Sequence, residues 1–341
     1  MAGKLKTKVI RPFRDLLLYS LLKSLFMFSG MFPRKFILLW HGLLAIFAFD
    51  LCTGLRKNIL KQLSLAYGKE KNAEELYRMG QEVFIHLSKT FTDYAIFSQM
   101  TTRQQFSKYF TVEGEEHLQK AYEKGKGVLC LVPHTAGWEF SAIMPPVLGY
   151  ETSAVSCEIR NPALNRLLIG LREKRAMKNI SRKKNTYEKL VDVLHNGECL
   201  IIMIDQDSKK VRGEFLQFFG MNAYTPLGCA RLAMETGAAV VPMATFRRPD
   251  DTYLFKILPE EEFQLSGDKE FDLRHNTQIY NDIMESLIRQ YPTQWVWMHK
   301  RWNTTPKSLK EFWDKKRAER PQFTVYVNGE KKATRGLYIQ G

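Results

Sequence analysis

Short apolar runs alternate with helix-like segments through most of the chain. The runs are bounded by turn-forming residues, as buried β-strands are, and the longer segments carry apolar residues at helical spacing. The predicted strands are the run from Gly127 to Pro133, Ser153–Cys157, Glu198–Ile204, Ala238–Phe246 and Tyr253–Ile257. The predicted helices are Ala73–Gln99, Glu115–Lys124, one after Asn161-Pro162, Tyr187–His195, Pro226–Glu235, His275–Gln290 and Lys307–Arg320. This alternation predicts an α/β fold with a central, mainly parallel or mixed sheet flanked by helices.

Two apolar blocks near the N-terminus have a different pattern. Leu16–Phe32 is interrupted by Lys23, whereas Phe36–Cys52 contains His41 and Asp50. Both blocks are near the lower length limit for a membrane-spanning helix. A spanning anchor, an interfacial hairpin and a buried helical pair all fit, and the basic residues that flank the blocks favour membrane attachment. No small-residue cleavage pattern follows the first block, so we do not expect a removed signal peptide.

These patterns divide the chain into three predicted parts. Residues 1–52 form a basic and hydrophobic membrane anchor, residues 53–320 an α/β domain, and residues 321–341 a tail of unknown role. Within this tail, the sequence Val327-Asn328-Gly329-Glu330 is typical of a hairpin turn.

Charge and cysteine content narrow the class of protein. The 341 residues include 51 Lys and Arg against 36 Asp and Glu, a net charge of +15 that favours acidic partners such as nucleic acid, anionic lipid or an acidic protein. We expect no nucleic-acid partner, since the chain has no zinc-finger spacing, RNA-binding aromatic signature or Walker loop. The five cysteines lack C-x-x-C spacing and are typical of reduced thiols, which indicates a cytoplasmic catalytic face.

The first candidate site is HTAGWE, which follows a predicted buried strand. It places Glu139 five residues after His134. On one straight helix such a pair would lie roughly 140° apart, so His134 must lie on the strand-to-helix turn and Glu139 inside the next helix. We predict that Glu139 orients the imidazole and makes His134 a general base. The alternative is a capping histidine beside a surface glutamate.

The second candidate site is Asp205-Gln206-Asp207, at the end of another predicted buried strand. Ligand sites gather at such strand ends in open α/β sheets. A metal site is the weaker alternative because no third acidic residue is near in the sequence, so we expect pairing of these carboxylates with Arg172 or Arg175, and no metal. Farther along, Phe215, Phe218 and Phe219 could line an apolar channel, although for two of the three we expect a core position.

The third candidate is WVWMHKRW, from Trp295 to Trp302. In an extended segment Trp295, Trp297 and His299 would share one face, and Lys300 and Arg301 would offer a phosphate contact. Tryptophans beside cations also suit a membrane interface.

These motifs, in this order, resemble the lipid A biosynthesis acyltransferase family, the bacterial late lauroyl and myristoyl transferases. The resemblance rests on HTAGWE, DQDSKKVRGEFLQFFG, TPLGCARLAMETGAAVVP and QWVWMHKRW and extends from about Asn58 to Trp302. The H-x4-E form favours this family over glycerolipid acyltransferases, which typically have H-x4-D.

The resemblance implies an O-acyltransferase attached to the bacterial inner membrane at its cytoplasmic face. Such an enzyme moves a fatty acyl chain from an acyl carrier protein thioester to a hydroxyl of a phosphorylated lipid A precursor, without a cofactor. His134 would be the base and Glu139 its support. The predicted substrate-binding and site-structuring residues are Arg172, Arg175, Asp205, Asp207, Lys300 and Arg301.

Three departures from the family pattern leave the acceptor open. Ser208-Lys209, Gln217 and Arg301-Trp302-Asn303 stand where the family usually has other residues. A lysophospholipid, glycolipid or aminolipid is an alternative acceptor. A non-catalytic relative that binds anionic lipid, or an unrelated protein that binds membrane surfaces or nucleic acid, are further alternatives.

Overall fold

A seven-stranded sheet forms the centre of the computed structural model, which describes residues 32–156, 161–182, 185–319, 322–327 and 330–335. Its strand order is β1-β9-β8-β2-β5-β3-β4, and every neighbouring pair is parallel except β8 with β9. The strands are β1 Phe110–Glu113, β2 Val128–Leu131, β3 Thr152–Ser156, β4 Met177–Ser181, β5 Cys199–Ile202, β8 Ala239–Arg247 and β9 Tyr253–Ile257. The predicted α/β class with a mainly parallel, mixed sheet is therefore confirmed.

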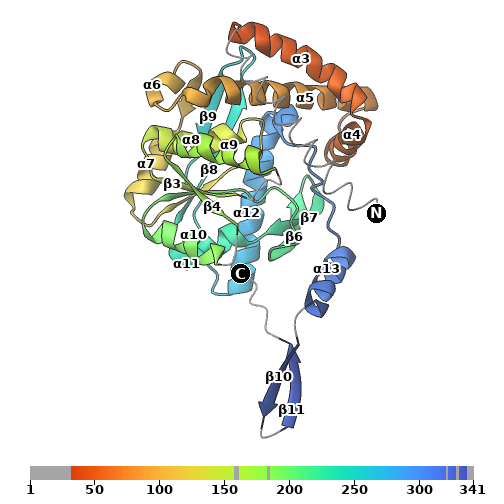
Figure 1. Cartoon of the computed structure of the whole chain (residues 1–341), viewed down its shortest axis with the longest axis vertical. Coiled ribbons are helices and arrows are strands. Elements are labelled where there is room, and N and C mark those ends of the chain that lie inside the picture. Colours follow the sequence, from red (N-terminus) through yellow and green to blue (C-terminus); the bar gives the residue numbers. More distant parts are fainter. Residues whose placement is uncertain (1–31, 157–160, 183–184, 320–321, 328–329, 336–341) are drawn as a thin grey trace.

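Helices cover both faces of this sheet (Figure 1). Along β2 the side chains alternate, with Leu129 and Leu131 in one core cluster and Val128 and Cys130 in the other. The first cluster includes residues of α10 Thr186–His195, α11 Gly228–Thr236 and α12 Lys269–Gln290. The second includes residues of α7 Glu115–Glu123, α8 Trp138–Leu148 and α9 Pro162–Glu173. Burial on both faces explains why β2 and β5 are continuous apolar runs.

Helices from the N-terminal part of the chain lie on top of this sandwich in Figure 1. They are α3 Arg34–Leu51, α4 Thr53–Tyr67 and α5 Ala73–Ile96, followed by the short η2 Phe97–Gln99 and α6 Arg103–Phe106. Asn72 caps α5 through a capping box with Glu75, and α3 packs along α5. The apolar block Leu16–Phe32 lies outside the described residues, apart from Phe32.

The described helices give a limited answer on membrane crossing. Taken singly, each helix in the described part of the chain is too short or too polar to span a bilayer. Helices α3 and α4 reach the length and hydropathy of a membrane-spanning segment only when they are taken together. The chain bends by 92° between them.

Several elements differ from the sequence-based expectation. Strands β1 and β4 and the hairpin of β6 Gly213–Phe218 with β7 Met221–Pro226 were not predicted, and Pro226 ends β7 instead of starting a helix. Helix α12 begins before His275 because the Asp268 side chain caps it, accepting from the amides of Glu270 and Phe271.

The C-terminal region agrees with the predicted helix and hairpin. Helix α13 spans Pro306–Ala318, and β10 Gln322–Val327 pairs antiparallel with β11 Glu330–Arg335. Residues Asn328 and Gly329 of the predicted turn lie outside the described residues, but Val327 stands opposite Glu330, as a two-residue hairpin loop requires. The division into three parts remains a prediction.

A buried ion cluster around Asp93 ties α3 and α5 to the sheet. Asp93 is fully buried and accepts hydrogen bonds from Arg34 at 2.6 and 2.8 Å, from Arg247 at 2.7 Å and from the Tyr253 hydroxyl at 2.9 Å. Arg247 is itself buried, on β8. Removing one partner of a buried pair leaves an uncompensated charge, which costs far more than losing a surface pair.

We therefore expect Asp93→Asn to lower the free energy of unfolding by about 3–5 kcal/mol, because Arg34 and Arg247 lose their buried counter-charge and Arg247 keeps only the longer ion pair with Asp251, at 3.4 Å. Chemical denaturation of the detergent-solubilised protein measures this. The control is Glu74→Gln, which removes an exposed ion pair with Arg78 on α5 and should cause no measurable change. Equal effects from the two variants would contradict the role given to the cluster.

Candidate active site

His134 lies in the loop that joins β2 to α8, three residues after the strand ends. The segment at Trp295 holds this loop: Thr135 and Trp295 form an isolated β-bridge, and the Val296 amide donates to the His134 carbonyl at 3.1 Å. Gly137 lies so close to β8 that an added Cβ would stand 2.8 Å from the Thr245 carbonyl oxygen. A glycine is therefore needed for α8 to start here.

The imidazole of His134 is held by Asp205. Its Nδ1 lies 2.6 Å from Asp205 Oδ1, and the His134 amide donates to Oδ2 at 2.7 Å. The Trp295 indole N–H donates to the same Oδ2 at 2.8 Å. Asp205 follows β5, which is the parallel neighbour of β2, so the two residues meet at the carboxyl ends of adjacent strands. Since an ionised carboxylate only accepts, Nδ1 must donate, which leaves Nε2 of His134 able to take a proton.

The charge on Asp205 is stabilised despite its burial. Burial by itself would raise the pKa of this carboxyl, but the neighbouring His134 and the hydrogen bonds from His134 and Trp295 outweigh it. Together they lower the pKa of Asp205 to about 2. The carboxylate therefore remains charged at neutral pH.

Glu139 faces Arg172 instead of His134, which corrects the prediction that it orients the imidazole. Arg172 donates through Nε to Oε2 at 3.0 Å and through Nη2 to Oε1 at 2.5 Å. The Trp138 indole N–H donates to Oε1 at 3.1 Å, and the Tyr94 hydroxyl lies 3.4 Å from Oε2. Burial raises the pKa of Tyr94, so its hydroxyl remains a donor. The pair joins the first turn of α8 to the last turn of α9, and both side chains are partly exposed.

The Asp205-Gln206-Asp207 segment does not pair with Arg172 or Arg175, contrary to expectation. The Asp207 carboxylate accepts from the Thr304 amide at 2.6 Å and from the Thr304 hydroxyl at 2.5 Å. Its backbone amide donates to His299 Nε2 at 2.9 Å. Asp207 thus fixes the loop after β5 to the segment that leads into α13, and the contacts assign it no direct role at the imidazole.

Two of the predicted substrate-binding arginines are buried structural residues. Arg175 donates to the carbonyls of Phe97, Met100 and Leu171. Arg301 is fully buried and donates to the Tyr224 carbonyl and the Thr225 hydroxyl at 2.7 Å each, and burial lowers its pKa to about 10. These contacts with the protein contradict the predicted roles in substrate binding.

The WVWMHKRW segment is not extended, because η3 Pro292–Gln294 leads into a series of turns. Trp295 and Trp297 are both buried, so they cannot lie at a membrane interface. Lys300 is exposed, and its phosphate contact remains a prediction. The aromatic residues of the β6–β7 hairpin agree with expectation: Phe218 and Phe219 are core residues.

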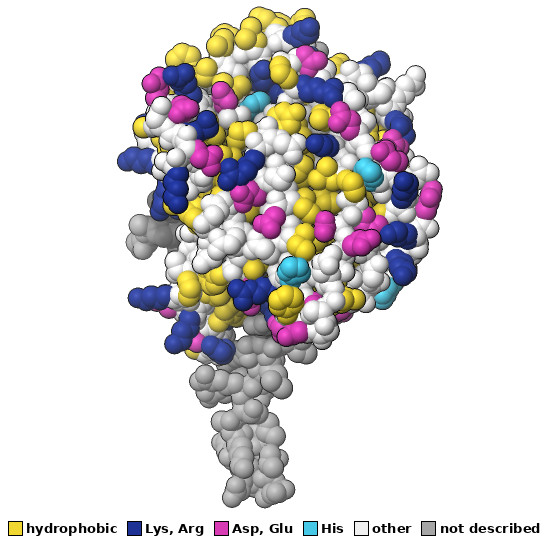
Figure 2. Space-filling model, turned by 180° about the vertical axis from the view of Figure 1, so that it is seen from behind, with side chains coloured by type: hydrophobic (Ala, Val, Ile, Leu, Met, Phe, Trp, Pro, Cys, Tyr) yellow, Lys and Arg dark blue, Asp and Glu magenta, His cyan; other side chains and the backbone are white. Residues whose placement is uncertain are grey.

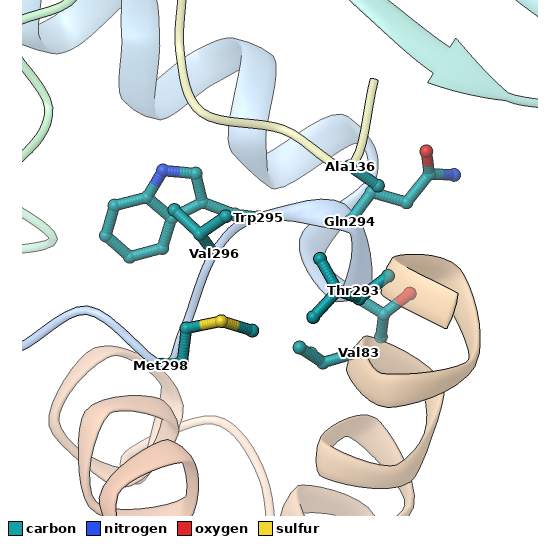
Figure 3. Close-up of a pocket in the computed structure, with 8 residues that line it drawn as sticks. Val83, Ala136, Thr293, Gln294, Trp295, Val296 and Met298 are labelled. Carbon is teal, nitrogen blue, oxygen red and sulfur yellow. The ribbon is translucent and has the colours of Figure 1, made fainter. Parts of the chain in front are cut away.

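A small pocket lies beside the His134 loop, between α5 and the Trp295 segment (Figure 3). Its lining includes Val83, Ala136, Trp295, Val296 and Met298. The cavity volume is about 10 Å³, close to the space of one water molecule. Sites for small molecules usually measure roughly 300–1,000 Å³, so we assign this pocket no acyl chain.

Comparison with known proteins identifies the family. Residues 9–304 match the family model described as bacterial lipid A biosynthesis acyltransferase. The chain belongs to this family. The chain is also similar to a phosphatidylinositol mannoside acyltransferase of Mycolicibacterium smegmatis, 25% identical over 190 residues. A lipid A biosynthesis palmitoleoyltransferase of Escherichia coli K12 is 26% identical over 250 residues, and a lauroyltransferase of the same organism is 25% identical over 211.

The alignments differ in how much of each acyltransferase they cover. The alignment with the M. smegmatis enzyme spans 55% of this chain and 60% of that enzyme. The alignment with the palmitoleoyltransferase spans 72% of this chain and 78% of the relative, and that with the lauroyltransferase spans 60% and 66%, in the same order. The chain thus covers less than two thirds of the M. smegmatis acyltransferase. Relatives named for phosphatidylinositol mannoside and for lipid A biosynthesis are thus similar to this chain at 25% and 26% identity.

The buried charge of Asp205 predicts how the stability of the protein changes in acid. The folded protein keeps Asp205 ionised down to about pH 2, whereas the unfolded chain protonates it near 3.8. Asp205 therefore adds stability that is fully present above about pH 5 and is lost as the pH falls through about 2. We expect a contribution of about 2 kcal/mol, measured as the pH-dependent difference in unfolding free energy between the wild type and Asp205→Asn. A difference that stays constant between pH 6 and 2 would contradict this.

Proposed function

We propose that this protein is an O-acyltransferase that transfers a fatty acyl chain from a thioester to a hydroxyl of a lipid A precursor. The observation that carries the proposal is the imidazole of His134 held by the ionised Asp205, with Nε2 left to act as a base. The family assignment supports an acyltransferase. The names of two E. coli relatives support the more specific proposal that the acceptor is a lipid A precursor.

His134 would act directly on the acceptor hydroxyl. As that oxygen attacks the thioester carbonyl, Nε2 of His134 takes its proton, and Asp205 stabilises the imidazolium that forms. The carbonyl carbon then forms a bond to the acceptor oxygen, the carbon–sulfur bond breaks, and the proton passes from His134 to the departing thiolate. The thioester is already activated, so no covalent enzyme intermediate is required.

The pair of Glu139 and Arg172 would position the acceptor. Although burial alone would lower the pKa of Arg172, the Glu139 carboxylate raises it, so the guanidinium remains charged beside the site. Both side chains are partly exposed, and Trp138 and Tyr94 donate to Glu139, which in turn holds Arg172. A fixed, charged and accessible pair is suited to hydrogen-bonding a polar lipid headgroup.

The positive charge of the protein supports an acidic carrier protein as the acyl donor and an anionic membrane as the location of the reaction. The net charge is +15, and α13 carries the exposed cations Lys307, Lys310, Lys315, Lys316 and Arg317. Helix α13 follows directly after Thr304, which is bonded to Asp207 near the candidate base. We therefore propose acyl carrier protein as the donor, and the cytoplasmic face of the bacterial inner membrane as the location.

A second acceptor has specific support. A family member named for phosphatidylinositol mannoside is about as similar to this chain as the lipid A enzymes are. The functional assay should therefore offer both acceptors.

Transfer of a radiolabelled acyl chain by the purified full chain in detergent tests the reaction. We expect His134→Ala and Asp205→Asn each to lower kcat by about 10²–10⁴-fold, because the base or its orienting charge is lost. The exposed His195→Ala on α10 is the matched control and should keep full activity. Wild-type transfer that persists in both site variants would rule out this base.

Charge reversal on α13 tests the donor. We expect the double variant Lys307→Glu and Lys310→Glu to raise KM for acyl carrier protein thioesters several-fold. An acyl-coenzyme A thioester, offered as a second donor without a carrier protein, should keep its KM, because only the carrier is an acidic protein. Lys120→Glu, exposed on α7, is the control. An unchanged KM for the carrier-bound donor would show that α13 does not recognise it.

A further inference from the structure

The outer face of α3 is apolar along its whole length. We define the α3 face as the seven large side chains on this helix that are 46–81% exposed: Phe36, Leu39, Trp40, Leu43, Leu44, Phe47 and Leu51. Residues 36–49 include no Asp, Glu, Lys or Arg. In Figure 2 hydrophobic side chains gather along the top of the molecule, where α3 lies in Figure 1. Such a continuous patch is unusual on a soluble surface and marks an interaction site.

The opposite face of α3 is already occupied by α5. Leu38, Ala45 and Phe49 are buried, and His41 Nδ1 lies 2.6 Å from the Thr92 hydroxyl of α5. At the start of α3 Arg34 forms the ion pair with Asp93 described above. The helix therefore lies flat on the domain, held at both ends. A helix that is apolar all round needs an apolar environment on both sides, so the α3 face needs a partner.

Cations at both ends of the helix indicate which partner. Lys35 is exposed at its start, and Lys57 and Lys61 are exposed on α4, which follows its end. Asp50, the one carboxylate of α3, lies near that end and is paired with Arg56. An apolar face bordered by Lys and Arg fits the surface of an anionic bilayer. The alternative occupant is the apolar block that begins at Leu16 and precedes α3. It follows directly on residues 1–15, whose five Lys and Arg against one Asp would be drawn to the same anionic surface, so we favour the bilayer and test the block as the alternative.

An aromatic connection joins this side of the molecule to the candidate active site. Phe91, on α5, is 51% exposed, and its ring centroid lies 6.2 Å from that of Trp138. The Trp138 ring in turn lies 6.2 Å from the His134 ring. A lipid that leaves the bilayer beside α5 therefore meets Phe91 and Trp138 before His134.

We infer that the α3 face binds in the plane of an anionic bilayer, with its side chains at the boundary between headgroups and acyl chains. A helix bound in this way reaches about 5–10 Å into that boundary and does not cross the membrane. The face orients the domain so that the acceptor lipid approaches His134 past Phe91 and Trp138. This last part rests on the proposed function, whereas the binding surface does not.

Quenching of Trp40 by brominated lipids tests the contact directly. The full chain is mixed with vesicles of phosphatidylcholine and phosphatidylglycerol brominated at shallow or deep acyl positions. We expect shallow bromines to quench Trp40 most, measured as the difference from Trp40→Phe, which removes the signal. The variant Phe47→Trp in the Trp40→Phe background should give the same depth, since the helix lies in the plane.

Two quenching results would overturn the inference. If residues 1–31 cover the α3 face, bromines at either depth should leave Trp40 unquenched. If α3 crosses the bilayer, the depths at positions 40 and 47 should differ.

Charge insertion tests the energetic role of the face. We expect the double variant Leu43→Glu and Phe47→Glu to weaken partitioning of the full chain to anionic vesicles on the order of tenfold or more. The matched control is Leu265→Glu with Phe271→Glu, which changes two exposed apolar residues outside α3, 75% and 54% accessible. Both pairs point to solvent, so folding should be retained, which circular dichroism checks. Equal partitioning of the two double variants would overturn the inference.

Failure of the membrane-binding inference can be distinguished from failure of the proposed acyl transfer. His134→Ala should bind vesicles as the wild type does, because the base is not part of the α3 face. Acyl transfer by a wild type whose Trp40 is not quenched would refute the surface and leave the reaction standing. Quenching of Trp40 without transfer to any acceptor would refute the reaction and leave the surface standing.

Discussion

The buried charge of Asp205 is the constraint on which the candidate site depends. A carboxylate without solvent must receive hydrogen bonds, and here they come from the amide and ring of His134 and from Trp295. These donors belong to two segments far apart in the sequence, and Asp205 itself lies in a third, the loop that follows β5. Satisfying one charge thereby fixes the strand-to-helix loop, the end of β5 and the turn after α12 relative to one another. The position of the His134 imidazole follows from an electrostatic requirement of the core.

The sequence predicted local structure better than it predicted partners. Apolar runs and caps located most elements around the site, and they showed that His134 and Asp205 both follow buried strands. They did not show that β2 and β5 are neighbours, because parallel pairing leaves no local mark in the sequence. Glu139 was chosen as the partner of His134 because it is the nearest carboxylate along the chain. The knowledge missing was strand order, which brings Asp205 closer in space.

The arginines illustrate a second limit. Arg172, Arg175 and Arg301 look equivalent in the sequence, yet the first lies partly exposed at the site while the other two satisfy carbonyl oxygens in the core. Composition gives the number of arginines but not how many of them donate to oxygen atoms of the protein itself. The same holds for the apolar block around α3: its hydropathy fits a spanning, interfacial or buried helix, and only its packing against α5 separates an inner from an outer face.

Asp205 with His134 and Glu139 with Arg172 form two networks that share no hydrogen bond. One network is built on strand ends and the Trp295 turn, and the other on α8, α9 and Tyr94. Under the roles proposed above, substitutions in the helical network would change how a headgroup is bound, while the hydrogen bonds that hold His134 stay in place. With these proposed roles, a family can change its acceptor while the chemistry at His134 stays the same, and protein engineers have a place at which to redirect specificity.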